Sequence, residues 1–518
     1  MKSYSIFALI QGLVLGLLVL WLWAENRPVG LPDAPLPADG RMQCVSYAPY
    51  YKAGETPFDE TAVTDPARIE ADLRLLSERF ACVRTYTVGQ GLDVVPEIAE
   101  KLGLKVLLGI WIGSDAVRNE REIARAVEIA RRHAPALRAV IVGNEVLLRR
   151  EQNLEAMRAL VSRVKAQISV PVSYADVWEF WLKNKSLAAD VDFAIVHILP
   201  YWEDEPQAIG DAVRHVDSVL ERCRTELQKP LLIGETGWPS RGKQREGAVP
   251  GLVNEARYFR EFLASADTKG WQYNLIEAFD QPWKRLLEGT VGGFWGIYAD
   301  DLTAKFPLKG PVAERRDGVT LPLGALAGLV LAVSLGVATG IRGAGLRRPG
   351  GVLGLGAFGA AYGLLIPLQL EYLQSACRNL IEYASMGGMA AAGLVLALAV
   401  PFLAAGRLRE SRVAGGACRL LLFGAAVSAL LLAVDARYRD FPLFLFLMPA
   451  IQLALALPAT GFRWQSPQRE RVLGPVLAVA GLAAWGADYG NPHAALWGLT
   501  CLLLAYSAIR PRSVPTAA

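Results

Sequence analysis

Long apolar segments fill the chain after about residue 319, and they constrain its fold more than any other feature. Stretches of about 20 apolar residues are long enough to cross a lipid bilayer as helices. We therefore predict an all-α polytopic membrane domain over residues 319–510, with about seven transmembrane helices in contact with the lipid bilayer. The expected helices lie near residues 319–341, 351–370, 383–405, 420–434, 441–460, 473–487 and 494–509.

A further apolar segment, residues 5–24, contains no charged residue. We predict that residues 1–24 form an uncleaved transmembrane anchor. A cleavable signal peptide is the alternative, but its apolar core is usually shorter, and Leu22 is too large for a good cleavage site. Lys2 precedes the segment, which favours a cytoplasmic N-terminus. The Pro-rich residues 25–40 are expected to form an extended linker.

The loops between the apolar segments alternate in charge. One set is rich in arginine and the other is nearly balanced, and arginine-rich loops are typical of the cytoplasmic side. With eight spans, this pattern places both termini inside and residues 25–318 outside the cytoplasm, in agreement with the position of Lys2. The arginines concerned are Arg342, Arg347, Arg348, Arg407, Arg409, Arg412, Arg419, Arg463, Arg469, Arg471, Arg510 and Arg512.

Residues 41–312 have a different pattern, in which short apolar runs alternate with stretches of helical periodicity. Such alternation indicates a parallel sheet covered by helices on both faces. Eight units in about 270 residues fit a (β/α)8, or TIM, barrel. A doubly wound open sheet is the alternative, but no Gly-rich phosphate loop follows the first run. The runs cover residues 44–50, 81–88, 105–112, 139–147, 171–178, 191–202, 230–240 and 273–283.

The expected strands end in polar and aromatic residues. Chemistry in TIM barrels takes place at the carboxyl ends of the strands. A mouth that combines aromatic rings with carboxylates suits a sugar, because rings stack on the apolar faces of pyranoses and carboxylates bond the hydroxyl groups. The candidate residues at these ends are Tyr47, Tyr50, Arg84, Tyr86, Asn144, Glu145, Tyr201, Trp202, Glu235, Trp238, Glu277, Asp280 and Trp283.

Glu145 and Glu235 are the candidate catalytic pair, because each follows an apolar run where an unpaired carboxylate is costly. Two carboxyls across a barrel mouth fit retaining glycoside chemistry. One carboxyl donates a proton to the leaving oxygen, and the other attacks the anomeric carbon. Structural glutamates in surface loops are the alternative interpretation.

Other kinds of site are not indicated by the sequence. The six cysteines form no CxxC or Cys/His cluster and there are only four histidines, so we expect no metal site and no cofactor. Basic runs with interleaved aromatic residues are missing from residues 41–312, so we expect no nucleic-acid partner. Cys44 and Cys82 fall on neighbouring predicted strands. We interpret them as buried free thiols, with a disulfide as the alternative.

The motifs VGNEVL at 142–147 and IGETGWPS at 233–240 closely resemble the signatures of glycoside hydrolase family 17, the β-1,3-glucanase-like enzymes. The runs YNLIEAFDQPWK at 273–284 and FWGIYADD at 294–301 are similar to further motifs of that family. The resemblance implies that Glu145 is the acid/base and Glu235 the nucleophile of a retaining enzyme. It also implies substrate contacts, with Asn144 at the 2-hydroxyl and Tyr201 near the nucleophile. The remaining implied substrate contacts are Arg84, Tyr86, Trp238, Asp280 and Lys284.

The combination of barrel and polytopic tail also resembles bacterial membrane proteins described as β-1,6-glucan synthase-like. That resemblance implies a β-1,3-glucan transglycosylase with a periplasmic barrel in the bacterial inner membrane. A membrane glucan synthase is then a candidate partner. An endo-β-1,3-glucanase and a non-catalytic glucan-binding or export component are the alternative hypotheses, and product sizing separates the three.

Overall fold

The structure is a computed structural model that describes residues 2–59, 61–338, 349–406, 408, 412–435, 439–462, 464 and 467–510. The chain forms two compact units. One is Pro28–Val312, and the other combines Met1–Arg27 with Ala313–Ala518. Several arginines that carry the orientation prediction lie outside the described residues, namely Arg342, Arg347, Arg348, Arg407, Arg409, Arg463 and Arg512.

The unit Pro28–Val312 contains, in its described residues, one eight-stranded parallel sheet with the order β7-β6-β5-β4-β3-β2-β1-β8. A parallel bridge between Ile233 and Tyr273 joins the two ends of this order, so the sheet closes into a barrel. The predicted fold class is confirmed. The strands are β1 (Met42–Ser46), β2 (Phe80–Arg84), β3 (Lys105–Ile110), β4 (Leu137–Asn144), β5 (Val172–Val177), β6 (Ala194–His197), β7 (Leu231–Glu235) and β8 (Asn274–Leu275).

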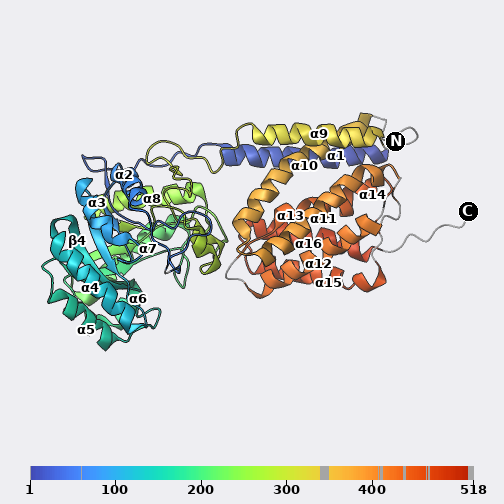
Figure 1. Cartoon of the computed structure of the whole chain (residues 1–518). Coiled ribbons are helices and arrows are strands. Elements are labelled where there is room, and N and C mark those ends of the chain that lie inside the picture. The colour runs from blue at the N-terminus through green and yellow to red at the C-terminus, as the bar shows by residue number, and fades with distance from the viewer. Residues whose placement is uncertain are drawn as a thin grey trace, which may run out of the picture. The chain divides into compact units, whose positions relative to one another are not determined.

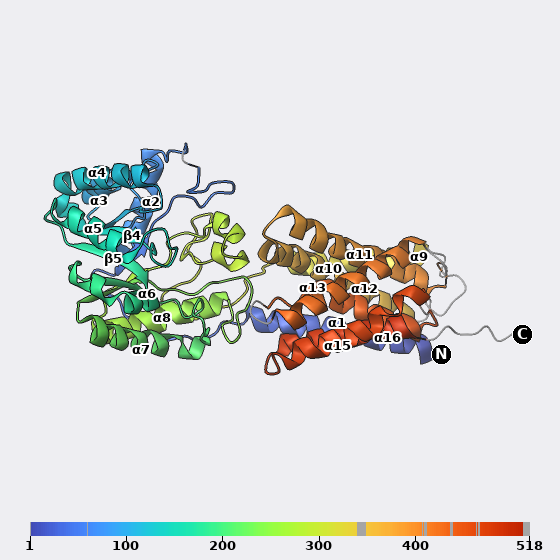
Figure 2. The same cartoon turned by 90° about the horizontal axis from the view of Figure 1, so that it is seen from below.

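Helices cover the outside of this barrel (Figures 1 and 2). Helix α4 shows why they form there, because the Asp115 side chain caps its first turn and an apolar stripe that includes Ile123 and Ala130 is buried. The α-helices of this unit, among the described residues, are α2 (Pro66–Ser77), α3 (Val95–Lys101), α4 (Ala116–Arg132), α5 (Leu154–Lys165), α6 (Trp178–Lys183), α7 (Ile209–Leu227) and α8 (Leu252–Lys269).

The inside of the barrel changes from apolar to polar along the strands. Cys44, Cys82 and Ile195 belong to one small buried apolar cluster. Side chains two positions further along a strand point to the same face of the sheet. Those positions hold Ser46, Arg84 and His197, all buried. The carboxyl ends of the strands therefore carry a buried polar layer above an apolar plug.

Cys44 and Cys82 form a disulfide, which corrects the interpretation of both residues as free thiols. Strands β1 and β2 pair in a register that sets Cys44 directly beside Cys82. The two Cα atoms are 4.3 Å apart. The sequence predicted that the two strands are neighbours, but the register that brings these thiols together depends on the closed sheet.

The Pro-rich segment, predicted as an extended linker over residues 25–40, lies against the barrel for part of its length. Val29 pairs with Val312 in an antiparallel bridge. Leu31 and Ala34 are buried in the main apolar core of the barrel. The segment is therefore extended and partly packed.

The second unit is helical, and the described residues include six helices that are long and apolar enough to cross a membrane. Two shorter apolar helical segments, Leu443–Ala459 and Leu473–Gly486, correspond to the remaining predicted spans. The helices are α1 (Lys2–Asn26), α9 (Thr320–Ala338), α10 (Pro349–Ala376), α11 (Leu380–Ala404), α12 (Arg412–Val434), α13 (Leu443–Ile451), α14 (Leu457–Ala459), α15 (Leu473–Gly486) and α16 (Pro492–Ile509).

Helix α1 is an integral part of this helical unit. It packs along α10, and the same α10 packs along α9. Gln11 of α1 and Gln452 exchange two side-chain hydrogen bonds of 2.8 and 3.1 Å, and both amides are fully buried. Gln452 begins a π-helical turn, Gln452–Ala456, that separates α13 from α14. A buried amide pair of this kind ties α1 to the carboxyl-terminal helices.

Candidate active site

Glu145 stands directly after β4, where the backbone turns sharply. Its φ is 53°, and Gly143 two residues earlier has a φ of 88°. A side chain at Gly143 would approach Val146 Cγ2 to 2.6 Å, so the turn requires glycine. The Glu145 amide donates to the Ala175 carbonyl at 2.8 Å, which holds the turn against β5. A left-handed non-glycine residue is uncommon and is typical of functional sites.

Glu235 ends β7 and is almost fully buried, with 8% of its side chain exposed. Its Oε1 accepts a hydrogen bond from the Tyr86 hydroxyl at 2.8 Å and pairs with Arg84 Nη1 at 3.2 Å. Arg84 also donates to the Asn144 side-chain oxygen at 2.5 Å. Through this one guanidinium, β2 braces the ends of both β4 and β7.

The two predicted catalytic glutamates face each other, with His197 between them. One carboxylate oxygen of each glutamate and one ring nitrogen of His197 all lie within 4.8 Å of one another. His197 Nδ1 is 3.1 Å from Glu145 Oε1, and Nε2 is 3.8 Å from Glu235 Oε1. The Glu145 side chain is 24% exposed, whereas the histidine side chain is fully buried. Glu145 is thus the more accessible member of the pair.

The surroundings of Glu235 favour its ionised form. Burial raises the pKa of Glu235, but the electrostatic interactions with His197 and Arg84 oppose this effect. The charge of Lys284 and the hydrogen bond from Tyr86 also lower this pKa. The net pKa of Glu235 lies below its ordinary value of 4.5. An ionised carboxylate at this position is suited to nucleophilic attack.

Lys284 reaches the site from the turn after β8. Its Nζ lies 3.0 and 3.1 Å from the two carboxylate oxygens of Glu277, and both side chains are nearly buried. Burial lowers the pKa of Lys284, but the attraction to Glu277 and Glu288 raises it by more than burial lowers it. The pKa of Lys284 is therefore well above its ordinary value. Lys284 therefore supplies a fixed positive charge near Glu235.

His197 was missed by the sequence analysis, although it lies in one of the predicted strands. A signal was available, because Ile195 and His197 share one face of β6 and that face points into the barrel. A lone histidine in an apolar run is more often a structural core residue, so sequence alone gave no reason to select it. The Glu288 and Asp176 carboxyls were likewise not selected, whereas Glu277 was among the polar residues noted at the end of the eighth strand.

Four of the predicted substrate-binding residues, Tyr47, Tyr201, Trp238 and Asp280, are buried in this structure. The Tyr47 hydroxyl donates to Asp72 at 2.8 Å. Tyr201 and Trp238 are fully buried, and their rings meet edge to face at 6.2 Å. Asp280 pairs with Lys305 at 2.9 Å. These residues have packing or bracing contacts here, and direct sugar contact stays a prediction for each.

Trp202 and Trp283 are partly exposed, as a sugar-stacking residue must be. Trp202 stacks on Trp295 at 6.1 Å, and the guanidinium of Arg245 lies 5.3 Å from its ring centre. Trp283 meets the exposed ring of Phe58 edge to face at 5.6 Å. Trp283 therefore has an accessible aromatic neighbour, whereas much of the Trp202 ring is engaged within the protein.

Glu145, His197 and Glu235 are close enough together to hold a metal ion. Arg84 lies 3.2 Å from Glu235 and 3.5 Å from His197 Nε2, however, and its charge opposes a cation at that place. The donor set fits proton transfer and nucleophilic attack better than it fits metal binding.

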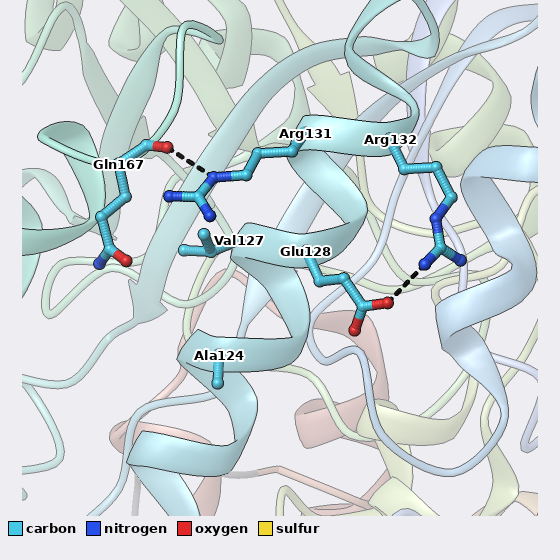
Figure 3. Close-up of a pocket in the computed structure, with 6 residues that line it drawn as sticks. All are labelled: Ala124, Val127, Glu128, Arg131, Arg132 and Gln167. Atoms are coloured by element: carbon cyan, nitrogen blue, oxygen red, sulfur yellow. Dashed lines mark hydrogen bonds and ion pairs between the residues drawn. The ribbon is translucent and has the colours of Figure 1, made fainter.

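A surface pocket on α4 lies apart from these residues (Figure 3). Arg131 Nε donates to the Gln167 carbonyl at 3.0 Å, and Arg132 pairs with Glu128 at 2.5 Å. No predicted site residue lines this pocket among the described residues. Its lining residues are Ala124, Val127, Glu128, Arg131, Arg132 and Gln167.

A parallel barrel with two facing carboxylates at the carboxyl ends of its strands is the arrangement of a glycoside hydrolase. Residues 44–296 match the family of the BtgE/BtgC glycoside hydrolase domain. This part of the chain is therefore similar to that glycoside hydrolase domain. The match covers just under half of the chain and lies between α1 and α9, outside the helices of the second unit.

Several known proteins are similar to the same part of the chain. A glucan 1,3-beta-glucosidase of Candida albicans is 26% identical over an alignment of 275 residues that covers 48% of this chain and 89% of that protein. A glucan 1,3-beta-glucosidase of Saccharomyces cerevisiae is 22% identical over 264 residues, covering 46% of this chain and 84% of that protein. An active-site mutant of the Rhizomucor miehei beta-1,3-glucanosyltransferase, solved with laminaritriose, is 22% identical and covers 53% of this chain and 98% of its own, with a TM-score of 0.46.

Proposed function

We propose that this protein is a membrane-anchored, retaining β-1,3-glucan transglycosylase that elongates, branches through β-1,6 bonds or cyclises glucan chains. The observation that carries the proposal is the separation of the glutamates, with carboxylate oxygens of Glu145 and Glu235 within 4.8 Å of each other. Retaining enzymes hold their carboxyls about 5–5.5 Å apart, whereas inverting enzymes need about 6.5–9.5 Å. The short separation supports retention.

Glu235 is the nucleophile in this proposal. Its carboxylate attacks the anomeric carbon and forms a glycosyl ester, while the carboxyl of Glu145 gives its proton to the departing glycosidic oxygen. In the second step Glu145 takes the proton of an acceptor hydroxyl, whose oxygen attacks the same carbon and releases Glu235 as a carboxylate. Arg84 and Tyr86 hold Glu235 in place through contacts of 3.2 and 2.8 Å.

The proposed substrate class, β-1,3-glucan, rests on the family match and on the names of the related glucosidases. Asn144 lies between Arg84 and Glu145, which suits a hydrogen bond to the sugar 2-hydroxyl. Lys284 and the partly exposed Trp283 are the next candidates for sugar contact.

Transfer and hydrolysis use the same first step and differ in what attacks the glycosyl ester. The resemblance in architecture, a barrel joined to polytopic helices, favours transfer. The names of the relatives, glucan 1,3-beta-glucosidases, favour hydrolysis as the second candidate function. Transfer is favoured over hydrolysis when an acceptor sugar, and not water, occupies the position from which the glycosyl ester is attacked.

We place the barrel on the outer, periplasmic side of a bacterial inner membrane. The apolar helices support a membrane location, and the arginine-rich loops support this orientation. The disulfide between Cys44 and Cys82 is a third support, because such bonds persist in oxidising compartments. A membrane glucan synthase is the proposed partner that supplies donor chains.

The test uses the full chain in detergent with β-1,3-gluco-oligosaccharides, whose products are sized over time. Longer or branched products identify transfer, shorter products alone identify hydrolysis, and unchanged substrate contradicts both. Glu235→Gln is expected to lower kcat/KM about a thousandfold or more. The matched control is Glu97→Gln, an exposed glutamate on α3, which is expected to leave the rate unchanged.

Azide separates the roles of the two glutamates. In Glu235→Ala, azide takes the place of the nucleophile and should give a glycosyl azide of inverted configuration. In Glu145→Ala, azide attacks the glycosyl ester and should give the retained configuration. The opposite pattern exchanges the assigned roles, and an inverted natural product rules out retention.

A further inference from the structure

The His197 ring is enclosed by charged groups from four strands. Arg84 of β2, Glu145 at the end of β4, Asp176 of β5 and Glu235 of β7 all interact with it. The side chain has no exposed surface. A buried imidazole among two carboxylates that must react is neither a simple core residue nor a solvent-exposed base.

The neighbouring strand is shaped to admit this ring. Gly234 precedes Glu235, and a Cβ atom there would lie 2.7 Å from Cδ2 and 3.0 Å from Nε2 of His197. Both distances are too short for ordinary van der Waals contact. The glycine of the IGET motif thus leaves the space in which the imidazole stands between β6 and β7.

The contacts of the ring assign its proton. Arg84 can only donate hydrogen bonds, and its Nη1 lies 3.5 Å from Nε2. The positive charge of this guanidinium disfavours a proton on Nε2, so we assign the ring proton to Nδ1, 3.1 Å from Glu145 Oε1. Nδ1 also carries a proton in the imidazolium ion, so Glu145 receives this hydrogen bond in both states of the ring.

We propose that His197 is the positioning residue of the acid/base, because its Nδ1–H occupies Oε1 of Glu145 and leaves the catalytic proton on Oε2. The proposal rests on the function proposed above. It specifies which carboxyl oxygen faces the glycosidic oxygen, and it makes His197 act through Glu145 rather than through Glu235.

This role has a distinctive kinetic consequence. Protonation of the leaving oxygen matters most when the leaving group is a sugar alcohol of high pKa, and it matters little for a dinitrophenolate. A residue that only supports the barrel affects both substrates alike. A residue that orients the acid affects the natural substrate far more than the activated one.

The test uses two variants of the full chain in detergent. His197→Asn retains an N–H donor near the position of Nδ1, and His197→Gln retains one near the position of Nε2. On β-1,3-gluco-oligosaccharides we expect His197→Gln to lose about 100-fold in kcat/KM, and His197→Asn to lose about tenfold or less. On a 2,4-dinitrophenyl laminarioside, both variants should remain within about fivefold of the parent.

Glu145→Gln is the reference for this experiment. It should show the same contrast between the two substrates, in stronger form. If Glu145→Gln shows no such contrast, the proposed function itself is contradicted. If Glu145→Gln shows the contrast but His197→Gln loses equally on both substrates, or if Asn is no better than Gln, only the role of His197 is overturned.

The pH profile gives a second readout for His197. Loss of the Nδ1–H contact should change the limb of the kcat/KM profile that reports the acid/base, and should leave the limb that reports the nucleophile in place. A profile identical to that of the parent, together with an unchanged substrate contrast, contradicts the positioning role.

Discussion

The phenol of Tyr86 donates a 2.8 Å hydrogen bond to Oε1 of Glu235, although 149 residues separate the two in sequence. The same hydroxyl lies 2.9 Å from the Ser46 hydroxyl on β1. The phenol, which follows β2, thus links Ser46 of β1 to the carboxylate of Glu235 at the end of β7. Because this hydrogen bond helps to lower the pKa of Glu235, it links the geometry of the barrel to the ionisation of the proposed nucleophile.

Tyr86→Phe tests that link with little change in volume. Glu235 must be ionised to attack, and its lowered pKa keeps it ionised below pH 4.5. The acidic limb of kcat/KM should therefore lie below pH 4.5 in the parent and move to higher pH in Tyr86→Phe. A rate loss of about tenfold at the optimum is expected from one lost charge-assisted hydrogen bond. A limb that stays in place or moves to lower pH contradicts the assigned role of Tyr86.

The disulfide between Cys44 and Cys82 should stabilise the barrel. The bond joins residues 38 apart in sequence, and a cross-link of this size contributes about 2–4 kcal/mol, mainly by restricting the unfolded chain. Cys44→Ala/Cys82→Ala should lower the unfolding free energy by that amount, measured as urea-dependent proteolysis of the barrel in the full chain.

Cys223→Ala is the control for the disulfide, since it removes a buried thiol that forms no such bond. It should have a smaller effect than the double variant. Alkylation of Cys44 in the unreduced, unfolded parent would show that the bond is absent.

Lys305 should be a structural rather than a catalytic cation. It is nearly buried and lies 2.9 Å from Asp280 and 3.0 Å from Glu255. Lys305→Met leaves both carboxylates without this partner and is expected to lower the unfolding free energy by about 3–5 kcal/mol. The exposed Lys101 on α3, replaced by Met, should have little effect. Reduced kcat/KM with unchanged stability would instead place Lys305 and Asp280 in the substrate site.

The predicted orientation in the membrane can be tested with two reporter fusions. Asn379 lies between α10 and α11, and Gly406 lies between α11 and α12. Alkaline phosphatase fused after Asn379 should be active, because that loop is predicted to lie outside the cytoplasm. The same enzyme fused after Gly406 should be inactive, whereas green fluorescent protein there should fluoresce. The reverse pattern would contradict the proposal and place the barrel on the cytoplasmic side of the membrane.

Much of the architecture was predictable from sequence, because local periodicity reports burial. All eight predicted strand runs overlap a strand, and the eight apolar segments overlap helices. The boundaries were less accurate. The eighth run was predicted over residues 273–283, but β8 comprises only Asn274–Leu275, since the chain beyond it pairs with later turns.

The sequence by itself determined the two-part organisation and the two candidate carboxylates, since both follow from residue types and spacing along one strand or helix. Only the tertiary structure decided which side chains meet. It bonded Cys44 to Cys82, placed His197 between Glu145 and Glu235, and turned Tyr47 toward Asp72. The physical reason is that register and closure of the barrel set distances between residues far apart in the chain, and local pattern carries no information about those distances.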